Sequence, residues 1–282
     1  KLLKNTRVLP LSPSSGLLAC DRLGDGRMVA TELIEIAIAS GLLNKDKHGL
    51  IKRDWIGKKL LVTSGPTIEA LDPARLITNR SSGRMGVLLA QAARFRGAQV
   101  DLVHGTLQIP NGWLEGLQTH ATKNFIEMQK CLAILQPSAD VVVMAAAIAD
   151  LRKKGELPSQ KLNKKALLKY MQEGFEIVPD LLLEITNQRA KGQKILGFAA
   201  LTGNDAEIKK LGEEKRLQKG CDLLMANPID RNGQGFEVDR NGGFLLGPEG
   251  MVQSMPVTSK LALAHQLLNA LVPLQDDIPQ KN

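Results

Sequence analysis

The sequence has few aromatic residues, cysteines and histidines, and it contains no long hydrophobic run. Phe, Trp and Tyr make up 3% of its 282 residues, which argues against the aromatic surfaces that stack on single-stranded nucleic acid. The three cysteines and four histidines lie far apart, so neither a disulfide framework nor a metal-binding spacing is present. No apolar stretch approaches the roughly 18 residues that a membrane-spanning helix needs. These absences favour a protein of the reducing cytoplasm that binds neither membrane nor nucleic acid.

The charge balance is basic. Lys and Arg number 37 against 29 Asp and Glu, which gives a formal net charge of +8, and 43% of the residues are hydrophobic, as in globular proteins. A basic protein binds anions, whether polynucleotides or small phosphates, and composition does not separate these partners. A non-catalytic basic binding module is therefore one hypothesis, although the charges are spread among loops without interleaved aromatic residues.

Short apolar strands alternate with helical patterns through most of the chain. We expect strands at residues 59–63, 99–103, 140–144, 195–198 and 222–226, helices at 84–96, 122–135, 204–219 and 258–271, and a hairpin around 241–243. This alternation predicts an α/β fold with a doubly wound, mainly parallel, Rossmann-like sheet. Ligands of such folds bind beyond the carboxyl ends of the strands, so the residues that follow each strand are the candidates for function.

Composition also predicts how the chain is divided. We expect an N-terminal arm at residues 1–42 with a helix at 31–41 capped by Thr31, a polar linker at 43–57, a compact domain at 58–272 and a disordered tail at 273–282. The chain begins with Lys1 and its first residues resemble no targeting peptide. We therefore expect it to be a piece of a longer protein.

The first candidate site is the end of the long polar loop after residue 64. Ser81, Ser82 and Gly83 stand where a helix begins, and the free N–H groups and dipole of a helix start favour an anion. An ordinary capped helix explains the same residues equally well. The spacing is neither GxGxxG nor a P-loop, which disfavours the alternative of an NAD(P)-dependent oxidoreductase without removing it.

Further candidates follow later strands. Small residues lead from Ala145 to Asp150, whose carboxylate suits a ribose hydroxyl or a phosphate-bound metal. Lys161 is the first residue of a lysine cluster on a loop, and such a loop is able to move over a bound triphosphate. Phe198 ends another strand, and Lys215 and Lys219 share one helical face. Each has a plainer explanation: close packing, a solvated basic face or a core phenylalanine.

Taken in order, the segments resemble one family. They are Gly65-Pro66-Thr67, Asp72-Pro73-Ala74-Arg75, the run from Asn79 to Gly86, the run from Ala145 to Asp150, the run from Gly197 to Ala200, and Ala226-Asn227. The same order occurs in bacterial phosphopantothenoylcysteine synthetase, the second half of the bifunctional coenzyme A biosynthesis flavoprotein. The resemblance covers about residues 57–272, and the run from residue 72 to residue 86 is its most specific part.

The resemblance implies a CTP-dependent ligase. In that family 4'-phosphopantothenate attacks the α-phosphate of CTP, pyrophosphate leaves, and an acyl cytidylate forms. The amino group of L-cysteine then displaces CMP to give 4'-phosphopantothenoylcysteine. Mg²⁺ assists at the triphosphate, and the ligase domain forms a homodimer, with a larger assembly where the flavoprotein half is present.

The resemblance also implies roles for particular residues. Lys161 matches the lysine needed for acyl cytidylate formation, and Asn79 matches the asparagine that handles this intermediate. Arg75 and the run Ser81-Ser82-Gly83 would hold the acyl substrate. The nucleotide contacts would be Met144, Ala146, Asp150, Lys161, Val178, Pro179, Phe198, Lys215 and Lys219. Asp150 is the candidate metal ligand.

The N-terminal arm resembles the tail of the family's other half, phosphopantothenoylcysteine decarboxylase. Cys20 matches the cysteine that protonates the decarboxylated product, and a lone cysteine is also often inert. The FMN-binding body of that domain is missing from this sequence. The resemblance therefore implies that decarboxylation needs the missing domain, and we expect none from this chain alone.

Overall fold

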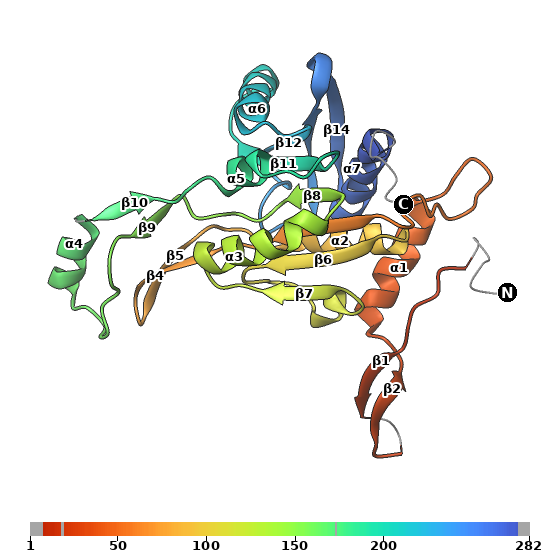
Figure 1. The fold of residues 1–282 in the computed structure, drawn as a ribbon, viewed down its shortest axis with the longest axis horizontal. Coiled ribbons are helices and arrows are strands. Elements are labelled where there is room, and N and C mark those ends of the chain that lie inside the picture. Colours follow the sequence, from red (N-terminus) through yellow and green to blue (C-terminus); the bar gives the residue numbers. More distant parts are fainter. Residues whose placement is uncertain (1–7, 18–19, 173, 276–282) are drawn as a thin grey trace.

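The structure is a computed structural model that describes residues 8–17, 20–172 and 174–275. Its centre is an eight-stranded sheet with the order β14-β13-β12-β11-β8-β3-β6-β7 (Figure 1). The strands are β3 (Lys59–Ser64), β6 (Gln99–His104), β7 (Gln118–Ala121), β8 (Val141–Met144), β11 (Lys194–Leu201), β12 (Leu223–Pro228), β13 (Arg240–Leu246) and β14 (Val252–Ser259). Every strand expected from the sequence is present.

The strand order identifies the topology. The strands from β12 to β7 are parallel, and β13 and β14 add an antiparallel edge. Numbered along the chain, the parallel strands follow the order 3-2-1-4-5-6, which is that of a dinucleotide-binding Rossmann sheet. The predicted doubly wound α/β fold is confirmed. The order reverses between β3 and β8, so the loops that leave these two strands flank the crevice where such folds bind ligands.

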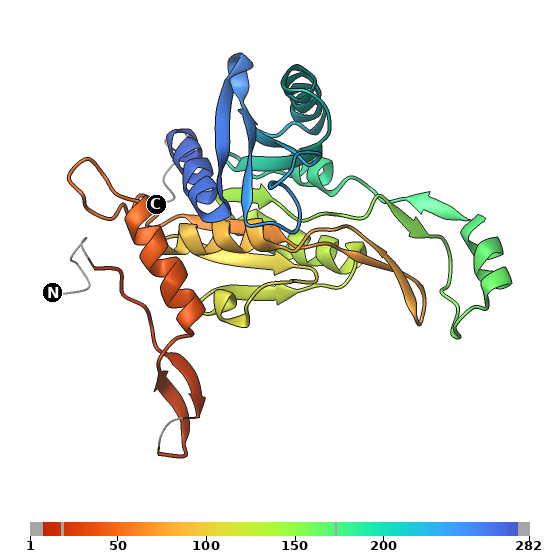
Figure 2. The same ribbon diagram turned by 180° about the vertical axis from the view of Figure 1, so that it is seen from behind.

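Helices cover both faces of the sheet (Figures 1 and 2). One hydrophobic core contains residues of α1 (Thr31–Leu43), α2 (Arg84–Phe95) and α7 (Lys260–Gln275). The other contains residues of α3 (Phe125–Leu135), α5 (Leu181–Asn187) and α6 (Asp205–Lys219). All residues of β8 are buried, as expected for a central parallel strand. No helix among the described residues has the length and apolar character needed to cross a membrane.

A long arm projects from one end of the sheet (Figure 1). It contains the hairpin of β4 (Ile68–Asp72) and β5 (Arg75–Thr78), the pair β9 (Leu151–Lys153) and β10 (Phe175–Ile177), and α4 (Lys164–Gln172). The sequence predicted a polar loop between residues 64 and 83. The structure forms a hairpin there instead, because the chain turns at Pro73 and pairs Ile68 with Thr78.

The N-terminal region forms a second protrusion. β1 (Ser14–Leu17) and β2 (Leu23–Arg27) make a hairpin that extends from the α1 side of the molecule (Figure 1). Residues 1–7 of the expected arm lie outside the described residues. The capping position of α1 is Ala30, not the predicted Thr31, which is the first residue of the helix, and no side chain caps it.

Three other expectations need correction or limits. The expected polar linker at residues 43–57 packs against the body, because Trp55 is fully buried and Asp54 pairs with Arg96. Residues 241–243 lie inside β13, where a bulge interrupts the register, and the chain reverses at Pro248–Gly250 instead. α7 continues to Gln275, past the expected start of the tail. Residues 276–282 of that tail lie outside the described part of the chain.

A buried polar network joins the helices of the first core. His265 of α7 contacts Ser40 of α1 with 2.9 Å between Nε2 and Oγ. Arg96, which follows α2, donates from Nη1 to the carbonyl oxygen of His265 at 3.2 Å and from Nε to Asp54 Oδ1 at 2.7 Å. Burial and the neighbouring Arg96 lower the pKa of His265 to about 4. The folded protein therefore holds this histidine neutral.

This network predicts a dependence of stability on pH. Between pH 6.5 and about 4 the unfolded chain binds a proton at His265 that the folded protein does not bind. The stability from the neutral imidazole is complete above pH 6.5 and is lost as the pH falls, by about 3 kcal/mol at most. Urea unfolding from pH 7 to 4 should show a smaller loss in His265→Gln than in the wild type. His48→Gln, at an exposed histidine, is the matched control and should behave as the wild type. Equal losses in wild type and His265→Gln would contradict the assignment.

Candidate active site

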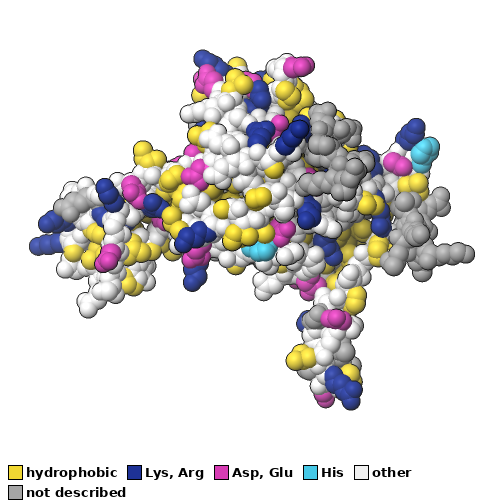
Figure 3. Space-filling model, viewed as in Figure 1, with side chains coloured by type: hydrophobic (Ala, Val, Ile, Leu, Met, Phe, Trp, Pro, Cys, Tyr) yellow, Lys and Arg dark blue, Asp and Glu magenta, His cyan; other side chains and the backbone are white. Residues whose placement is uncertain are grey.

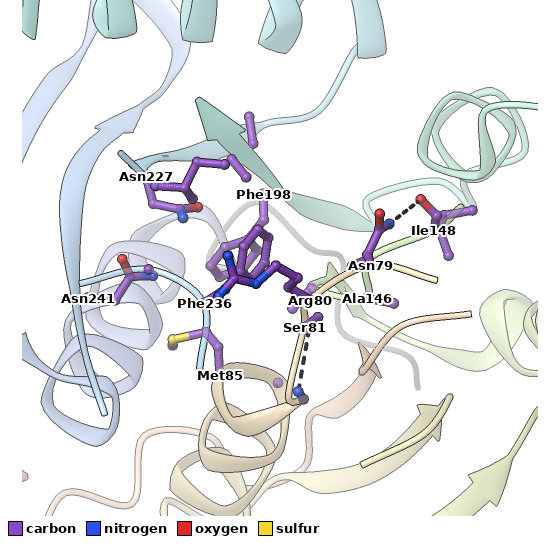
Figure 4. A pocket seen from close by; sticks show the side chains of 18 of the residues that line it. Asn79, Arg80, Ser81, Met85, Ala146, Ile148, Phe198, Asn227, Phe236 and Asn241 are labelled. Carbon is purple, nitrogen blue, oxygen red and sulfur yellow. Dashed lines mark hydrogen bonds between the residues drawn. The ribbon is translucent and has the colours of Figure 1, made fainter. Parts of the chain in front are cut away.

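A cavity of about 640 Å³ opens at the carboxyl ends of the parallel strands, on both sides of the point where the strand order reverses. Figure 4 shows several of its lining side chains, including Asn79, Met85, Phe198 and Asn227. The residues that line it come from the segment after β5 and the first turn of α2, from the loop after β8, from β11, β12, α5 and α6, from the segment between β12 and β13, and from β13 and α7. The crevice expected for this topology is therefore a real hollow in the molecule.

Close backbone packing sets the position of α2 at the floor of the cavity. Gly83 adopts a left-handed conformation with φ of 78° at the helix start, which favours glycine. Ser64 Oγ donates to the carbonyl oxygen of Gly83 at 2.6 Å. A Cβ atom at Gly86 would lie 2.6 Å from Ser64 Cβ, so only glycine allows this approach. No side chain caps the first turn, so its N–H groups lack the partner that a cap residue would give them.

The loop after β8 is fixed to the loop after β3. Ala147 N donates to the carbonyl oxygen of Gly65 at 3.0 Å, and Thr67 N donates back to Ala147 O at 3.2 Å. Asn79 Nδ2 donates to the carbonyl oxygen of Ile148 at 2.9 Å (Figure 4). These bonds orient the Asn79 amide and hold the shelf of small residues beside the helix start. Asp150 ends this shelf, with an exposed carboxylate.

The opposite wall carries two lysines and an aromatic ring. Phe198 of β11 and both Lys215 and Lys219 of α6 line the cavity. Lys219 forms an ion pair with Asp180, which also caps α5 by accepting from Leu183 N at 2.9 Å. Lys215 is exposed and has no ion pair within the described residues. It is therefore the more available of the two cations for an anionic ligand.

The segment between β12 and β13 closes part of the cavity and was missed from the sequence. Its residues Gln234 and Phe236 line the hollow. Arg80 Nε donates to Glu237 Oε2 at 3.0 Å, and Arg84 pairs with Asp239, so two ion pairs clip this segment to the region of α2. The Gly- and Asn-rich composition predicted only a loop or hairpin, and no pattern signalled its contact with a helix far away in sequence.

The structure brings most of the predicted site residues together. Those that line the cavity are Asn79, Ser81, Ser82, Gly83, Ala146, Asp150, Phe198, Lys215 and Lys219. Met144 lies in the core, where Thr63 Oγ1 contacts its sulfur at 3.8 Å. Val178 is also buried, and neither it nor the exposed Pro179 lines the cavity. For these three residues the role in nucleotide binding stays a prediction, because none of them lines the cavity.

Three other predicted residues lie elsewhere. Arg75 pairs with Asp72 at 2.7 Å near the turn of the β4–β5 hairpin, and its Nη1 also donates to Leu162 O at 3.2 Å. Lys161, the residue before Leu162, is exposed on the same arm. Neither Arg75 nor Lys161 lines the cavity of its own chain. Cys20 is exposed in the turn of the N-terminal hairpin, on a different protrusion (Figure 1).

Asp150 is the predicted metal ligand, and it lines the cavity. No group of three or more His, Cys, Asp or Glu side chains suited to a metal ion occurs among the described residues. Mg²⁺ often keeps several waters and is held by one or two carboxylates together with substrate phosphates. A lone exposed carboxylate at the cavity fits a metal that arrives with a triphosphate, and it does not fit a metal held by protein ligands alone.

Comparison with known proteins identifies the family. Residues 55–274 match the family described as the DNA/pantothenate metabolism flavoprotein C-terminal domain. This chain belongs to that family. The family found from the ordered motifs is therefore confirmed, and the membership gives no support to the oxidoreductase alternative.

The curated relatives are longer than this chain. The Coenzyme A biosynthesis bifunctional protein CoaBC of Mycobacterium tuberculosis is 34% identical over 96% of this chain, which spans 64% of its length. CoaBC of Bacillus subtilis is 30% identical over 96% of the chain and again 64% of the relative. Their remaining third has no counterpart in this chain.

Solved structures share the fold. The crystal structure of the C-terminal domain of CoaBC matches with a TM-score of 0.65 and 26% identity, covering 80% of this chain and all of that domain. The DNA/pantothenate metabolism flavoprotein from Streptococcus pneumoniae matches with a TM-score of 0.59 and 16% identity, over 76% of this chain and 98% of that protein. The second likeness concerns the fold alone.

The glycine packing under the cavity gives a test of the geometry. In Gly86→Ala the new methyl group would meet Ser64 and, at 2.8 Å, the Thr63 carbonyl oxygen. We expect the free energy of unfolding, measured with urea, to fall by about 1–3 kcal/mol. Gly41→Ala is the matched helical control, because its Cβ would have only Ile51 Cδ1 at 3.8 Å. That control should be neutral or stabilising by up to about 1 kcal/mol. A Gly86→Ala protein as stable as the wild type would show that α2 is not held this tightly.

Proposed function

We propose that this chain joins 4'-phosphopantothenate to L-cysteine in a reaction driven by CTP. The proposal is supported by the family of the chain and by relatives named as coenzyme A biosynthesis proteins at 30–34% identity. The observation that carries it is one cavity that gathers an uncapped helix start, the oriented Asn79 amide, Asp150 and Lys215. This set suits a polyphosphate ligand beside a second substrate.

The first step activates a carboxylate. The carboxylate oxygen of 4'-phosphopantothenate attacks the α-phosphorus of CTP, a P–O bond forms, and the bond to pyrophosphate breaks. Negative charge grows on the leaving pyrophosphate, and cations placed in advance stabilise it. Lys215 serves this purpose from the cavity wall, and Lys161 serves it from the arm. The small residues from Ala145 to Ala147 leave room for the nucleotide to lie on the backbone.

The second step forms the amide. The amino nitrogen of L-cysteine attacks the acyl carbon, a C–N bond forms, the C–O bond to CMP breaks so that CMP leaves with the bonding electrons, and the amine releases a proton to the solvent. Asn79 Nδ2 is engaged by the Ile148 carbonyl group, so its Oδ1 is available to accept from the incoming amine. Mg²⁺ bound with CTP would neutralise triphosphate charge, and Asp150 is the carboxylate that would hold it. We propose a cytoplasmic location, because the free cysteines suit a reducing compartment.

We propose that the enzyme acts as a homodimer in which the arm of one copy serves the cavity of the other. Arg75 and Lys161 lie outside the cavity of their own chain, on the projecting arm. The arm also exposes apolar side chains, among them Leu168 at 62% and Ile177 at 81%. On the face drawn in Figure 3 it carries basic and apolar side chains together, a combination that suits contact with a second protein surface. FMN and the role of Cys20 belong with the flavin-binding half, and we propose no decarboxylation by this chain alone.

The activity is tested by pyrophosphate release. Purified protein with 4'-phosphopantothenate, L-cysteine, Mg²⁺ and CTP should release pyrophosphate, and ATP in place of CTP should be a poorer substrate. Lys161→Gln should lose about 100-fold or more in the first step, since a cation facing the leaving group is removed. Asn79→Asp should accumulate acyl cytidylate, detected by mass spectrometry. A folded chain that releases no pyrophosphate with CTP, or that binds NADPH and ignores CTP, would end the proposal.

The shared site has its own test. Mixed dimers of Lys161→Gln and Asn79→Asp chains should regain part of the activity that each homodimer lacks, because one of the two cavities then contains both wild-type residues. Wild-type protein diluted with a Lys164→Gln chain, whose lysine is not assigned a role, is the control for mixing. If mixed dimers, verified by mass, recover no activity, Lys161 and Asn79 belong to a site formed within one chain.

A further inference from the structure

Arg84 and Lys260 bring positive charge to the cavity from outside the motifs that suggested its function. Arg84 is the first residue of α2, and Lys260 is the first residue of α7. Both line the cavity. The two helices pack in one core, whereas Lys215 and Lys219 come from α6 on the other face of the sheet. The cavity therefore has cations on both sides.

The Lys260 side chain is buried without a counter-charge of its own. The residue is 5% exposed, and its ammonium group forms no hydrogen bond or ion pair with any residue that the structure describes. The nearby carboxylate, Asp239, already pairs with Arg84. Burial and Arg84 lower the pKa of Lys260 to about 8, while Asp239 opposes them. The lysine is therefore still charged at neutral pH, where an unpaired buried charge is destabilising.

Two further donors at the same place have no side-chain partner in the part of the chain that the structure describes. Arg84 Nε is buried and makes no hydrogen bond to the described residues, although Arg84 Nη1 contacts Asp239. The first turn of α2 has no side-chain cap, in contrast to α3, α5 and α6, which Asn124, Asp180 and Asn204 cap. An ammonium group, a guanidinium N–H and free helix amides all require an acceptor of negative charge.

We propose that Lys260, Arg84 Nε and the first amides of α2 together bind a phosphoryl group of a substrate. A phosphoryl oxygen accepts from all three kinds of donor and matches their charge. The carrier is either the CTP triphosphate or the phosphate monoester of 4'-phosphopantothenate. The identity of the carrier rests on the proposed function, whereas the anion site rests only on the groups described above.

The test compares Lys260→Met, which keeps the apolar stem and removes the charge, with Lys130→Met. Lys130 is an exposed lysine of α3 that does not line the cavity, so this control corrects for the loss of one positive charge. Lys260→Gln is a second variant in case the first does not fold. Binding of inorganic pyrophosphate, CTP and 4'-phosphopantothenate to the full chain is measured separately by calorimetry at pH 7.

We expect Lys260→Met to weaken inorganic pyrophosphate and one of the two substrates by about 10- to 100-fold, which corresponds to one charge-assisted hydrogen bond. The substrate affected identifies the carrier. Lys130→Met should bind as the wild type. Unchanged binding of all three ligands in Lys260→Met and Lys260→Gln would overturn the inference. If wild type binds pyrophosphate through Lys260 but binds neither substrate, the anion site stands and the proposed ligase function fails.

Stability without ligand gives an independent readout. Removing an uncompensated buried charge should raise the urea midpoint of Lys260→Met above that of the wild type at pH 7. This difference between the urea midpoints of Lys260→Met and the wild type should shrink between pH 8 and 10.5. Over that range Lys260 of the folded wild type has lost its proton, whereas Lys260 of the unfolded chain loses it only near pH 10.5. A lysine with only a structural role would lower the midpoint when replaced, and that result would also contradict the inference.

Discussion

The contact between the end of β3 and the start of α2 is the constraint on which the cavity depends. Ser64 Oγ donates to Gly83 O, and Gly86 has no space for a Cβ atom. This hydrogen bond and the close packing of Gly86 hold the first turn of α2 against the end of β3, so that the amides of this turn lie at the carboxyl edge of the sheet. A side-chain cap would satisfy these donors and fill the same space. The bare helix start is therefore a condition of the proposed binding, in which an anion would take the place of the missing cap.

The positive charge at the cavity is also not fully neutralised by the described residues. A protein optimised for stability alone would pair or remove a buried lysine, because an unpaired charge in a medium of low polarity is destabilising. Arg84 Nε instead has no hydrogen-bond partner among the described residues, and the buried Lys260 has nearby only Asp239, which already pairs with Arg84. The ion pair between Arg84 and Asp239 holds the segment after β12 against the start of α2. Because Asp239 is one carboxylate near two cations, Arg84 and Lys260, a positive charge remains at the cavity. A ligand that brought its own negative charge would pair with these donors, and its binding would stabilise the folded protein.

Sequence patterns predicted the layers of the fold and much of the site, for physical reasons. Strands such as β8 are continuous apolar runs because both of their faces are covered, and the residues after them meet at one edge by topology alone. The hairpin of β4 and β5 escaped prediction because two of the buried positions of β4 are acidic, Glu69 and Asp72, so its burial does not show as an alternation of apolar residues. Lys260 escaped because its role depends on β14 delivering α7 to the cavity, a contact that no local pattern encodes. Residue types alone also could not show that Arg75 and Lys161 lie on the arm instead of the cavity rim.

The far end of α2 explains how its first turn is able to remain open. Arg96 follows the helix at its C-terminus, where a positive charge is favourable to the helix dipole. It is fully buried, bonds to Asp54, and reaches the carbonyl group of His265 in α7. These bonds tie this end of α2 to the segment before β3 and to α7. Because the helix is secured there and by the apolar face between its ends, the amino end does not need a cap to stay in place. A strong anchor at one end thus allows the other end to keep its helical turn without a side-chain cap.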